Sequence, residues 1–237
     1  MKLLVSVRDA DEAVLAAAGG VSFIDLKEPG QGALGGLPID TIRHIVGVLR
    51  QRSSRLPISA TIGDVPMQRL DEIRARVQAV GSCGVDYVKV GIDPSHMGDA
   101  RRALALLAGL AGEGLAIVPV FLADRGLDVD LLQHPGRGHW AGVMADTADK
   151  RAGSLLDVVA RAALARFVSA SRHAGLMVGL AGALRASDAA ALAQLAPDFA
   201  GFRTAVCRGD RAGALDAGRL RELVQAMGEA ERMAAAA

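Results

Sequence analysis

The sequence has 237 residues, of which 51% are hydrophobic and 22% are charged, with a formal net charge of +1. This composition is typical of a folded globular protein and excludes a disordered chain. The near-neutral charge and the aromatic content of 3% argue against a nucleic-acid surface, which would need a basic face or stacking aromatic side chains.

The sequence also argues against a membrane protein and against export. It contains no uninterrupted apolar run of about 18 residues, the minimum for a membrane-spanning helix. Charged residues follow the first apolar run at once, where a signal peptide would remain apolar. Cys83 and Cys207 have no neighbours at the spacing of a metal or redox motif. We therefore expect a cytoplasmic protein that binds neither membrane nor nucleic acid.

Short apolar runs alternate with longer segments along the whole chain. Several runs are almost continuously apolar, as expected for strands that are covered on both faces. Strands are predicted at residues 2–7, 23–27, 57–62, 87–92, 115–123, 141–147, 175–182 and 199–206.

The segments between the runs have helical periodicity. In residues 39–52 and 70–80 the apolar positions follow a spacing of three and four, with charged residues opposite. Asp9, with Glu12 three residues later, predicts a capping box at the start of the first helix. Residues 127–138 lack a long helical pattern, and we expect a short helix or a lid-like loop there.

Eight strands that alternate with seven or eight helices predict a fold of the α/β class, a single-domain (β/α)8 TIM barrel over residues 1–237. A doubly wound open sheet is the alternative, but no GxGxxG turn follows the first strand, where a dinucleotide site would begin. A short flexible tail is expected from about residue 231.

Lysine is rare in this chain and falls near the ends of predicted strands. The 27 basic residues include four lysines, of which Lys27 ends the second strand, Lys89 lies in the fourth and Lys150 follows the sixth. Asp25 lies two positions before Lys27, so both side chains point to the same face of that strand. Asp146 closes the sixth strand. If the even-numbered strands are in phase, these side chains converge at the barrel mouth, where barrel enzymes carry their catalytic groups.

Such a cluster favours Schiff-base chemistry. Arginine stays protonated, whereas a lysine in a dry or cationic site can lose its proton and attack a carbonyl carbon. Neighbouring lysines lower one another's pKa by repulsion, and carboxylates can transfer protons during imine formation. In the alternative interpretation each lysine is an ordinary salt-bridged side chain, with Asp25 and Lys27 as one pair.

The last two strands predict a phosphate site. Gly179 and Gly182 follow or end the seventh strand, and Arg203 and Arg208 follow the eighth, where barrels often bind phosphate through backbone N–H groups and a helix N-terminus. Arg203 or Arg208 could clamp the phosphate oxygens. After the third strand, Thr61 and Asp64 are expected to line the same mouth. The histidines show no ligand spacing, so no metal site is predicted.

Seven stretches together resemble a known family over the whole chain. In order they are LLVS, IDLKEPGQGALG, SATIGDVP, DYVKVG, MADTADK, GLAGAL and GFRTAVCRGDR. They resemble the (5-formylfuran-3-yl)methyl phosphate synthases, also called 4-HFC-phosphate synthases. The stretches IDLKEPGQGALG and SATIGDVP are the most specific part of the resemblance.

The resemblance implies a lyase-type condensation of two molecules of glyceraldehyde 3-phosphate. One molecule isomerises to dihydroxyacetone phosphate and forms an imine with Lys27; aldol addition of the second, loss of one phosphate and dehydration then give the furan. Methanogens use this product as a precursor of methanofuran, and methylotrophic bacteria use it for a related cofactor. Asp25, Lys89, Asp146 and Lys150 match the family's other polar active-site positions. No redox cofactor and no metal are implied.

The chain departs from the family at one position. Archaeal members carry a further active-site lysine near the end of the fifth strand, but no lysine occurs here between Lys89 and Lys150. Arg125 could replace it electrostatically. Barrels of this kind often associate through their outer helices, so a homo-oligomer is expected.

Two other functions remain open at the level of sequence. A class I aldolase acting on a triose or deoxyribose phosphate would share the barrel, the imine lysine and the phosphate site. A non-catalytic barrel that binds a sugar phosphate or serves as a scaffold would need no reactive lysine.

Overall fold

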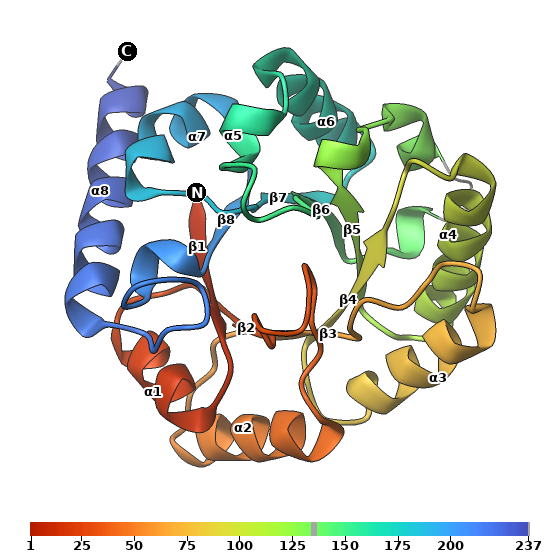
Figure 1. Ribbon diagram of the computed structural model, residues 1–237, viewed down its shortest axis with the longest axis horizontal. Helices are drawn as coiled ribbons and strands as arrows, with labels where there is room; N and C mark the ends of the chain where they lie inside the picture. The colour runs from red at the N-terminus through yellow and green to blue at the C-terminus, as the bar shows by residue number, and fades with distance from the viewer. Residues whose placement is uncertain (134–136, 237) are drawn as a thin grey trace.

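The computed structural model describes residues 1–133 and 137–236. Within these residues eight parallel strands close into a barrel in the order β1 to β8, and the helices form a ring around it (Figure 1). This arrangement confirms the predicted single-domain (β/α)8 barrel. The strands are β1 (Lys2–Val7), β2 (Phe23–Leu26), β3 (Ile58–Thr61), β4 (Tyr87–Ile92), β5 (Ile117–Leu122), β6 (Gly142–Asp146), β7 (Met177–Leu180) and β8 (Phe199–Phe202).

The predicted helical segments are present as α2 and α3. The α-helices are α1 (Ala10–Ala18), α2 (Ile39–Gln51), α3 (Leu70–Gly81), α4 (Met97–Gly112), α5 (Leu155–Val158), α6 (Arg161–His173), α7 (Ala189–Leu195) and α8 (Ala217–Ala235). Short 3-10 helices are η1 (Ala123–Arg125), η2 (Val129–Gln133), η3 (Arg137–His139), η4 (Ala186–Asp188) and η5 (Thr204–Val206). The expected short helix or lid at 127–138 thus contains η2 and the start of η3, while its residues 134–136 lie outside the described residues.

The interior of the barrel is apolar at the amino-terminal ends of its strands. The ring of Phe23, at the start of β2, lies 5.5 Å from that of Phe199 and 6.4 Å from that of Tyr87. Gly179 makes room for this layer, because a Cβ atom at that position would lie 2.1 Å from the Phe199 ring. Side chains alternate along a strand, so Asp25 and Lys27 follow Phe23 on the same face, nearer the carboxyl end.

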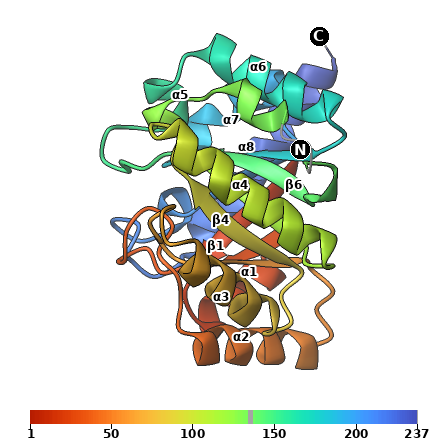
Figure 2. The same ribbon diagram turned by 90° about the vertical axis from the view of Figure 1, so that its right-hand side faces the viewer.

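The loops that carry the polar residues gather at the carboxyl ends of the strands. In Figure 2 the N-terminus lies on the right, and the loops after β2 (orange-red) and β8 (blue) lie together on the left. Helix α8 includes residues up to Ala235, and the flexible tail expected from about 231 stays a prediction. No described helix is long and apolar enough to cross a membrane.

The start of α1 differs in one respect from the predicted capping box. Asp9 caps the helix, because its Oδ1 accepts a hydrogen bond from the Glu12 N–H at 2.9 Å. Glu12, however, does not return a bond to Asp9; its buried carboxylate accepts from the backbone N–H groups of Arg8 and Leu215 and is paired with Arg203. The reciprocal half of the capping box is wrong because a buried carboxylate gains more from a guanidinium than from one N–H.

Candidate active site

Asp25 forms the floor of a polar pocket at the carboxyl end of the barrel. Its side chain is buried and accepts hydrogen bonds from Ser6 Oγ at 3.0 Å, Ser59 Oγ at 2.6 Å and Lys89 Nζ at 2.8 Å. The strand register explains this convergence, since Ser6 and Ser59 are the direct neighbours of Asp25 on β1 and β3. Four hydrogen-bonding groups from four strands thus form one fixed network.

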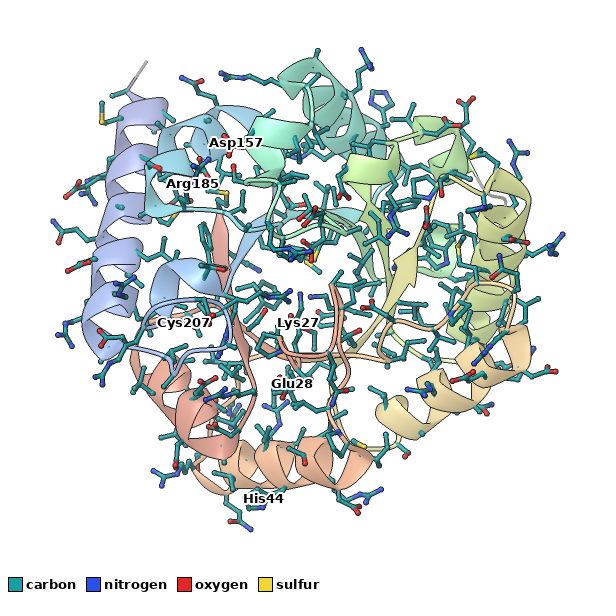
Figure 3. All side chains as sticks on the ribbon, viewed as in Figure 1. Lys27, Glu28, His44, Asp157, Arg185 and Cys207 are labelled. Atoms are coloured by element: carbon teal, nitrogen blue, oxygen red, sulfur yellow. The ribbon has the colours of Figure 1, made fainter. Side chains whose placement is uncertain are left out.

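Lys27 stands above this floor and is paired with a different carboxylate. Its Nζ lies 3.6 Å from Oδ2 of Asp146, while Lys150 donates to Oδ1 of the same carboxylate. The N–H of Thr147 also donates to that Oδ1 at 2.8 Å. The alternative that Asp25 and Lys27 form a simple ion pair is therefore wrong, because Asp25 is paired with Lys89. Figure 3 shows Lys27 near the centre of the ring of strands.

The pocket lowers the pKa of the Lys27 amine. Burial has the largest effect and, against the opposing effect of Asp146, brings the pKa to about 8 from an ordinary 10.5. Lys150 and Lys89 lower it further by repulsion, and Asp25 opposes them. A substantial fraction of this amine is therefore neutral at mildly alkaline pH, as a nucleophile that attacks a carbonyl must be.

Burial and the two neighbouring lysines act on the pKa of Asp146 in opposite directions. Burial alone would raise the pKa of its carboxyl group, but Lys150 and Lys27 outweigh that effect and hold the pKa well below its ordinary range. Asp146 is thus an ionised base between two amines, one of which can react while the other stays bound to it.

Small residues of β7 and β8 and the loops after them form the wall opposite β2. Ala181, Gly182, Ala183 and Thr204 line the pocket, which encloses about 30 Å³, the space of roughly one water molecule. Gly182 has a φ of 116°, and a Cβ there would lie 2.8 Å from the Thr147 side chain, so glycine is required. Of the two predicted glycines, Gly182 lies in the pocket, whereas Gly179 lies against Phe199 below it.

Arg203 and Arg208 have different surroundings. Arg203 is buried and also lines the pocket. All five of its N–H donors are used by protein acceptors: two by the Glu12 carboxylate and three by the carbonyl oxygens of Ser6, Arg211 and Gly213. Arg208 points to solvent and pairs with Asp216 at 2.8 Å. Neither guanidinium is directed at the pocket with free donors.

Thr61 and Asp64 fix the loop of residues 28–35. The Thr61 hydroxyl donates to the Leu34 carbonyl at 2.9 Å, and the Asp64 carboxylate accepts from the Leu34 N–H at 3.0 Å. Leu34 itself is buried in the interior cluster of the barrel, against Gly91 of β4. The two most specific sequence stretches therefore form one structural unit beside Lys27.

A second cavity of about 410 Å³ opens beside this loop at the same end of the barrel. Its lining includes Asp64, His96 and Arg125, and the Arg125 guanidinium is paired with Asp93. Arg125 therefore lies at the mouth but outside the lysine pocket, so its proposed substitution for a family lysine stays a prediction.

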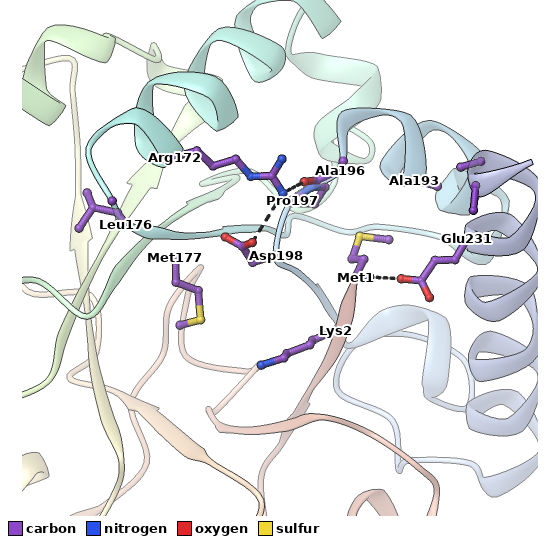
Figure 4. Close-up of a pocket in the computed structure, with 13 residues that line it drawn as sticks. Met1, Lys2, Arg172, Leu176, Met177, Ala193, Ala196, Pro197, Asp198 and Glu231 are labelled. Atoms are coloured by element: carbon purple, nitrogen blue, oxygen red, sulfur yellow. Dashed lines mark hydrogen bonds and ion pairs between the residues drawn. The ribbon is translucent and has the colours of Figure 1, made fainter. Parts of the chain in front are cut away.

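A larger cavity of about 880 Å³ lies at the opposite, amino-terminal end (Figure 4). Four of its charged groups form two pairs, the Met1 amine with Glu231 and Arg172 with Asp198, and the Lys2 amine lies 5.5 Å from the centre of the Phe23 ring. In barrel enzymes this end contributes to stability and the other end to catalysis. The lysine pocket is therefore the candidate active site.

Sequence reasoning missed three residues of this site. Ser6 and Ser59 are polar residues within apolar strands, and this contrast could have identified them. Arg211 lines the pocket together with Lys27 and Asp146, but no sequence signal separates it from the other arginines near it. Within residues 1–133 and 137–236 no group of three or more His, Cys, Asp or Glu side chains is arranged to hold a metal ion.

Comparison with known proteins agrees with this geometry. The model of the 4-HFC-P synthase family matches residues 3–224. A (5-formylfuran-3-yl)methyl phosphate synthase of Archaeoglobus fulgidus is 34% identical over 243 aligned positions, covering 97% of this chain and 99% of its own. That of Methanopyrus kandleri is 33% identical, covering 95% and 98%.

Solved structures share the fold at low sequence identity. A phosphoribosyl anthranilate isomerase of Thermus thermophilus has a TM-score of 0.67 at 13% identity, covering 97% of this chain and 99% of its own. A deoxyribose phosphate aldolase of Aeropyrum pernix has a TM-score of 0.64 at 15% identity, covering 94% and 89%. These likenesses support the barrel alone. The sequence matches carry more information, and by them the chain belongs to the 4-HFC-P synthase family.

Proposed function

We propose that this protein condenses two molecules of glyceraldehyde 3-phosphate into (5-formylfuran-3-yl)methyl phosphate through an imine on Lys27. The observation that carries the proposal is the buried Lys27 amine, whose pKa is lowered to about 8 beside an ionised carboxylate. Family membership supplies the reaction, and this amine supplies a nucleophile suited to it.

The first half of the reaction uses the amine and its carboxylate. One triose isomerises to dihydroxyacetone phosphate, and the neutral Lys27 amine attacks its ketone carbon to form a carbinolamine. Asp146, 3.6 Å from Lys27 Nζ, is the base nearest to the reacting nitrogen. Lys150, bound to the same carboxylate, is the acid that can protonate the departing hydroxyl as water leaves.

The second half needs a carbon nucleophile and an acid. Loss of a proton beside the imine gives an enamine, which adds to the aldehyde carbon of the second triose. We assign Lys89, whose amine is fixed by Asp25 at 2.8 Å, the role of donating a hydrogen bond to the oxygen that becomes an alkoxide. Elimination of one inorganic phosphate, ring closure and loss of two further water molecules follow, and hydrolysis, which takes up one water, releases the Lys27 amine. Two trioses thus give the furan phosphate, one inorganic phosphate and two water molecules.

We also propose the cellular role that the family implies. The product carries an aldehyde and one remaining phosphate, and it would serve as a precursor of methanofuran or a related furan cofactor. We place the reaction in the cytoplasm on the sequence grounds given above. The chemistry assigned to these residues needs no redox cofactor.

A product assay tests the proposal. Glyceraldehyde 3-phosphate is incubated with the wild-type protein, and inorganic phosphate and furan absorbance are followed together. We expect the two to appear in equal amounts. A simple class I aldolase would give a hexose bisphosphate without phosphate release, and a binding protein would give neither product.

A matched pair of variants links the activity to the site. Lys27→Arg keeps the charge but removes the nucleophile, so we expect turnover to be lost while the fold survives. Lys2→Arg makes the same exchange at the start of β1, on the amino-terminal side of the barrel, and should leave turnover unchanged. Turnover by Lys27→Arg at the wild-type rate would overturn the assignment.

A further inference from the structure

The loop of residues 208–216, after β8, is held rigidly at the barrel mouth. Arg203 donates to the carbonyl oxygens of Arg211 and Gly213, both at 2.8 Å, and Arg8 donates to the carbonyl oxygen of Ala212 at 2.6 Å. Within the loop, Asp210 Oδ1 accepts from the N–H groups of Ala212 and Gly213 at 2.9 and 3.2 Å. The backbone position from which the Arg211 side chain extends is therefore fixed.

The Arg211 side chain lines the lysine pocket from this loop. It is half-buried, and its guanidinium has no hydrogen-bond or ion-pair partner within the part of the chain that the structure describes. Burial lowers the pKa of Arg211, and the carboxylates of Asp146 and Asp64 oppose that effect. An unpaired, partly desolvated guanidinium reduces the stability of the protein, and a bound anion would remove that cost.

The neighbouring arginines do not have this property. Every N–H donor of Arg203 is satisfied by the protein, and Arg208 is exposed and paired with Asp216. Of the three arginines in this stretch, Arg211 is therefore the one that lines the pocket with donors available to a ligand.

The pocket has a cationic excess on this side. Lys27, Lys89, Lys150 and Arg211 face the two carboxylates of Asp25 and Asp146 in its lining, since the charge of Arg203 is compensated by Glu12. The same wall adds backbone donors at the turn after β7, where the N–H groups of Ala183 and Leu184 make no hydrogen bond to the protein in the described structure. A guanidinium fork and nearby N–H groups suit a phosphate dianion.

We infer that Arg211 binds the phosphate group of the triose that reacts with Lys27. Arg203 does not touch the substrate; it positions Arg211 by donating a hydrogen bond to the carbonyl oxygen of Arg211. This inference deepens the proposed function and rests on it for the identity of the triose. It assigns Arg211 the phosphate contact that the sequence suggested for Arg203 or Arg208.

The test uses a ligand that cannot form an imine. Binding of glycerol 3-phosphate is measured by calorimetry on the wild type, Arg211→Gln, Arg211→Lys and Arg208→Gln. We expect the dissociation constant to rise roughly 10- to 100-fold in Arg211→Gln and less in Arg211→Lys, which keeps the charge but loses the fork. Arg208→Gln, on the same loop, should bind within about twofold of the wild type.

A second measurement separates binding from reactivity. Dihydroxyacetone, which lacks the phosphate, is trapped on the protein with borohydride, and Arg211→Gln should be labelled as readily as the wild type. Wild-type affinity of Arg211→Gln for glycerol 3-phosphate, or no binding of this ligand by the wild-type protein, would overturn the inference. An equal loss of dihydroxyacetone trapping and phosphate binding would also overturn it, since it would indicate a damaged pocket.

The two proposals can fail separately. If the wild-type protein binds glycerol 3-phosphate through Arg211 but traps no carbonyl compound on Lys27, the imine mechanism is wrong and the phosphate site stands.

Discussion

Oδ2 of Asp146 lies 3.6 Å from the side-chain nitrogen of Lys27, and its other oxygen is held by Lys150. One buried carboxylate thus serves two amines from different positions along the chain. This arrangement keeps Asp146 ionised and oriented while the Lys27 amine remains free to react.

The reactivity of Lys27 should depend on pH. Only the neutral amine attacks a carbonyl carbon, and the pKa of about 8 predicts that the rate of borohydride-dependent labelling rises with a midpoint near pH 8. Lys150→Met removes a cation that lowers this pKa and leaves Asp146 to Lys27 alone, so the midpoint should move upward. Initial labelling rates from pH 6 to 10 measure both, with Lys2→Met as the control. A midpoint that is unchanged or lower in Lys150→Met contradicts the electrostatic assignment.

Lys27 should also reduce the stability of the fold. Its pKa is about 8 in the folded protein and 10.5 ordinarily, so between these values the unfolded chain binds a proton that the folded chain lacks. Below pH 8 the folded protein bears the full cost of a buried ammonium, and this cost declines as the pH rises toward 10.5. Lys27→Met should therefore increase the free energy of unfolding by about 1–3 kcal/mol at pH 7.

Urea unfolding of Lys27→Met and wild type at pH 7 and pH 10 measures this effect. The difference in the free energy of unfolding between Lys27→Met and the wild type should be smaller at pH 10 than at pH 7. A Lys27→Met protein that is less stable than the wild type at pH 7 would show that the ion pair with Asp146 contributes more than burial costs.

The barrel and its lysines were predictable because both follow from local pattern. Apolar runs marked every strand, and the two-residue spacing of Asp25 and Lys27 placed them on one face. Which carboxylate pairs with which lysine could not be predicted from the sequence pattern. The pairing of Lys89 with Asp25 and of Lys27 with Asp146 depends on strand tilt and side-chain reach, which the pattern does not contain.

The three arginines after β8 show most clearly what the sequence pattern cannot predict. Arg203, Arg208 and Arg211 lie within nine residues, and composition cannot tell which is buried, which is exposed and which faces the pocket. The burial of Arg203 depends on its pairing with Glu12, which is 191 residues away in the sequence and also accepts a hydrogen bond from the Leu215 N–H in the loop after β8. The geometry of this loop, which Arg203 and Glu12 help to fix, decides which guanidinium lines the pocket with free donors.

Arg203 is expected to act mainly through stability. Arg203→Met leaves the buried Glu12 carboxylate with only the partly exposed Arg8, 3.5 Å away, as its cation. Loss of the buried partner of such a pair destabilises a protein by about 3–5 kcal/mol. Arg208→Gln removes an exposed pair and should change stability by less than about 1 kcal/mol. Urea unfolding measures the free energy of unfolding of Arg203→Met, Arg208→Gln and the wild type. An Arg203→Met protein of wild-type stability would contradict the structural role.

Thr61 should stabilise the loop of residues 28–35. Thr61→Val keeps the shape of the side chain but removes the hydroxyl that donates to the Leu34 carbonyl at 2.9 Å. We expect the free energy of unfolding to fall by about 1–3 kcal/mol, because the buried carbonyl oxygen of Leu34 is left without its donor. Hydrogen exchange should increase first in this loop.

Thr41→Val is the control, because Thr41 lies on α2 and its hydroxyl makes no hydrogen bond within the described residues. Equal protection of the loop in Thr61→Val and in the wild type would show that Asp64 and Leu34 packing suffice.

The most direct test of the proposed mechanism is to find where the substrate becomes attached. The protein is incubated with glyceraldehyde 3-phosphate, reduced with borohydride, weighed intact and digested for peptide mapping. We expect one triose-phosphate adduct per chain, located on Lys27 and absent from Lys27→Arg. An adduct on Lys89 or Lys150, or no adduct on well-folded protein, would contradict it.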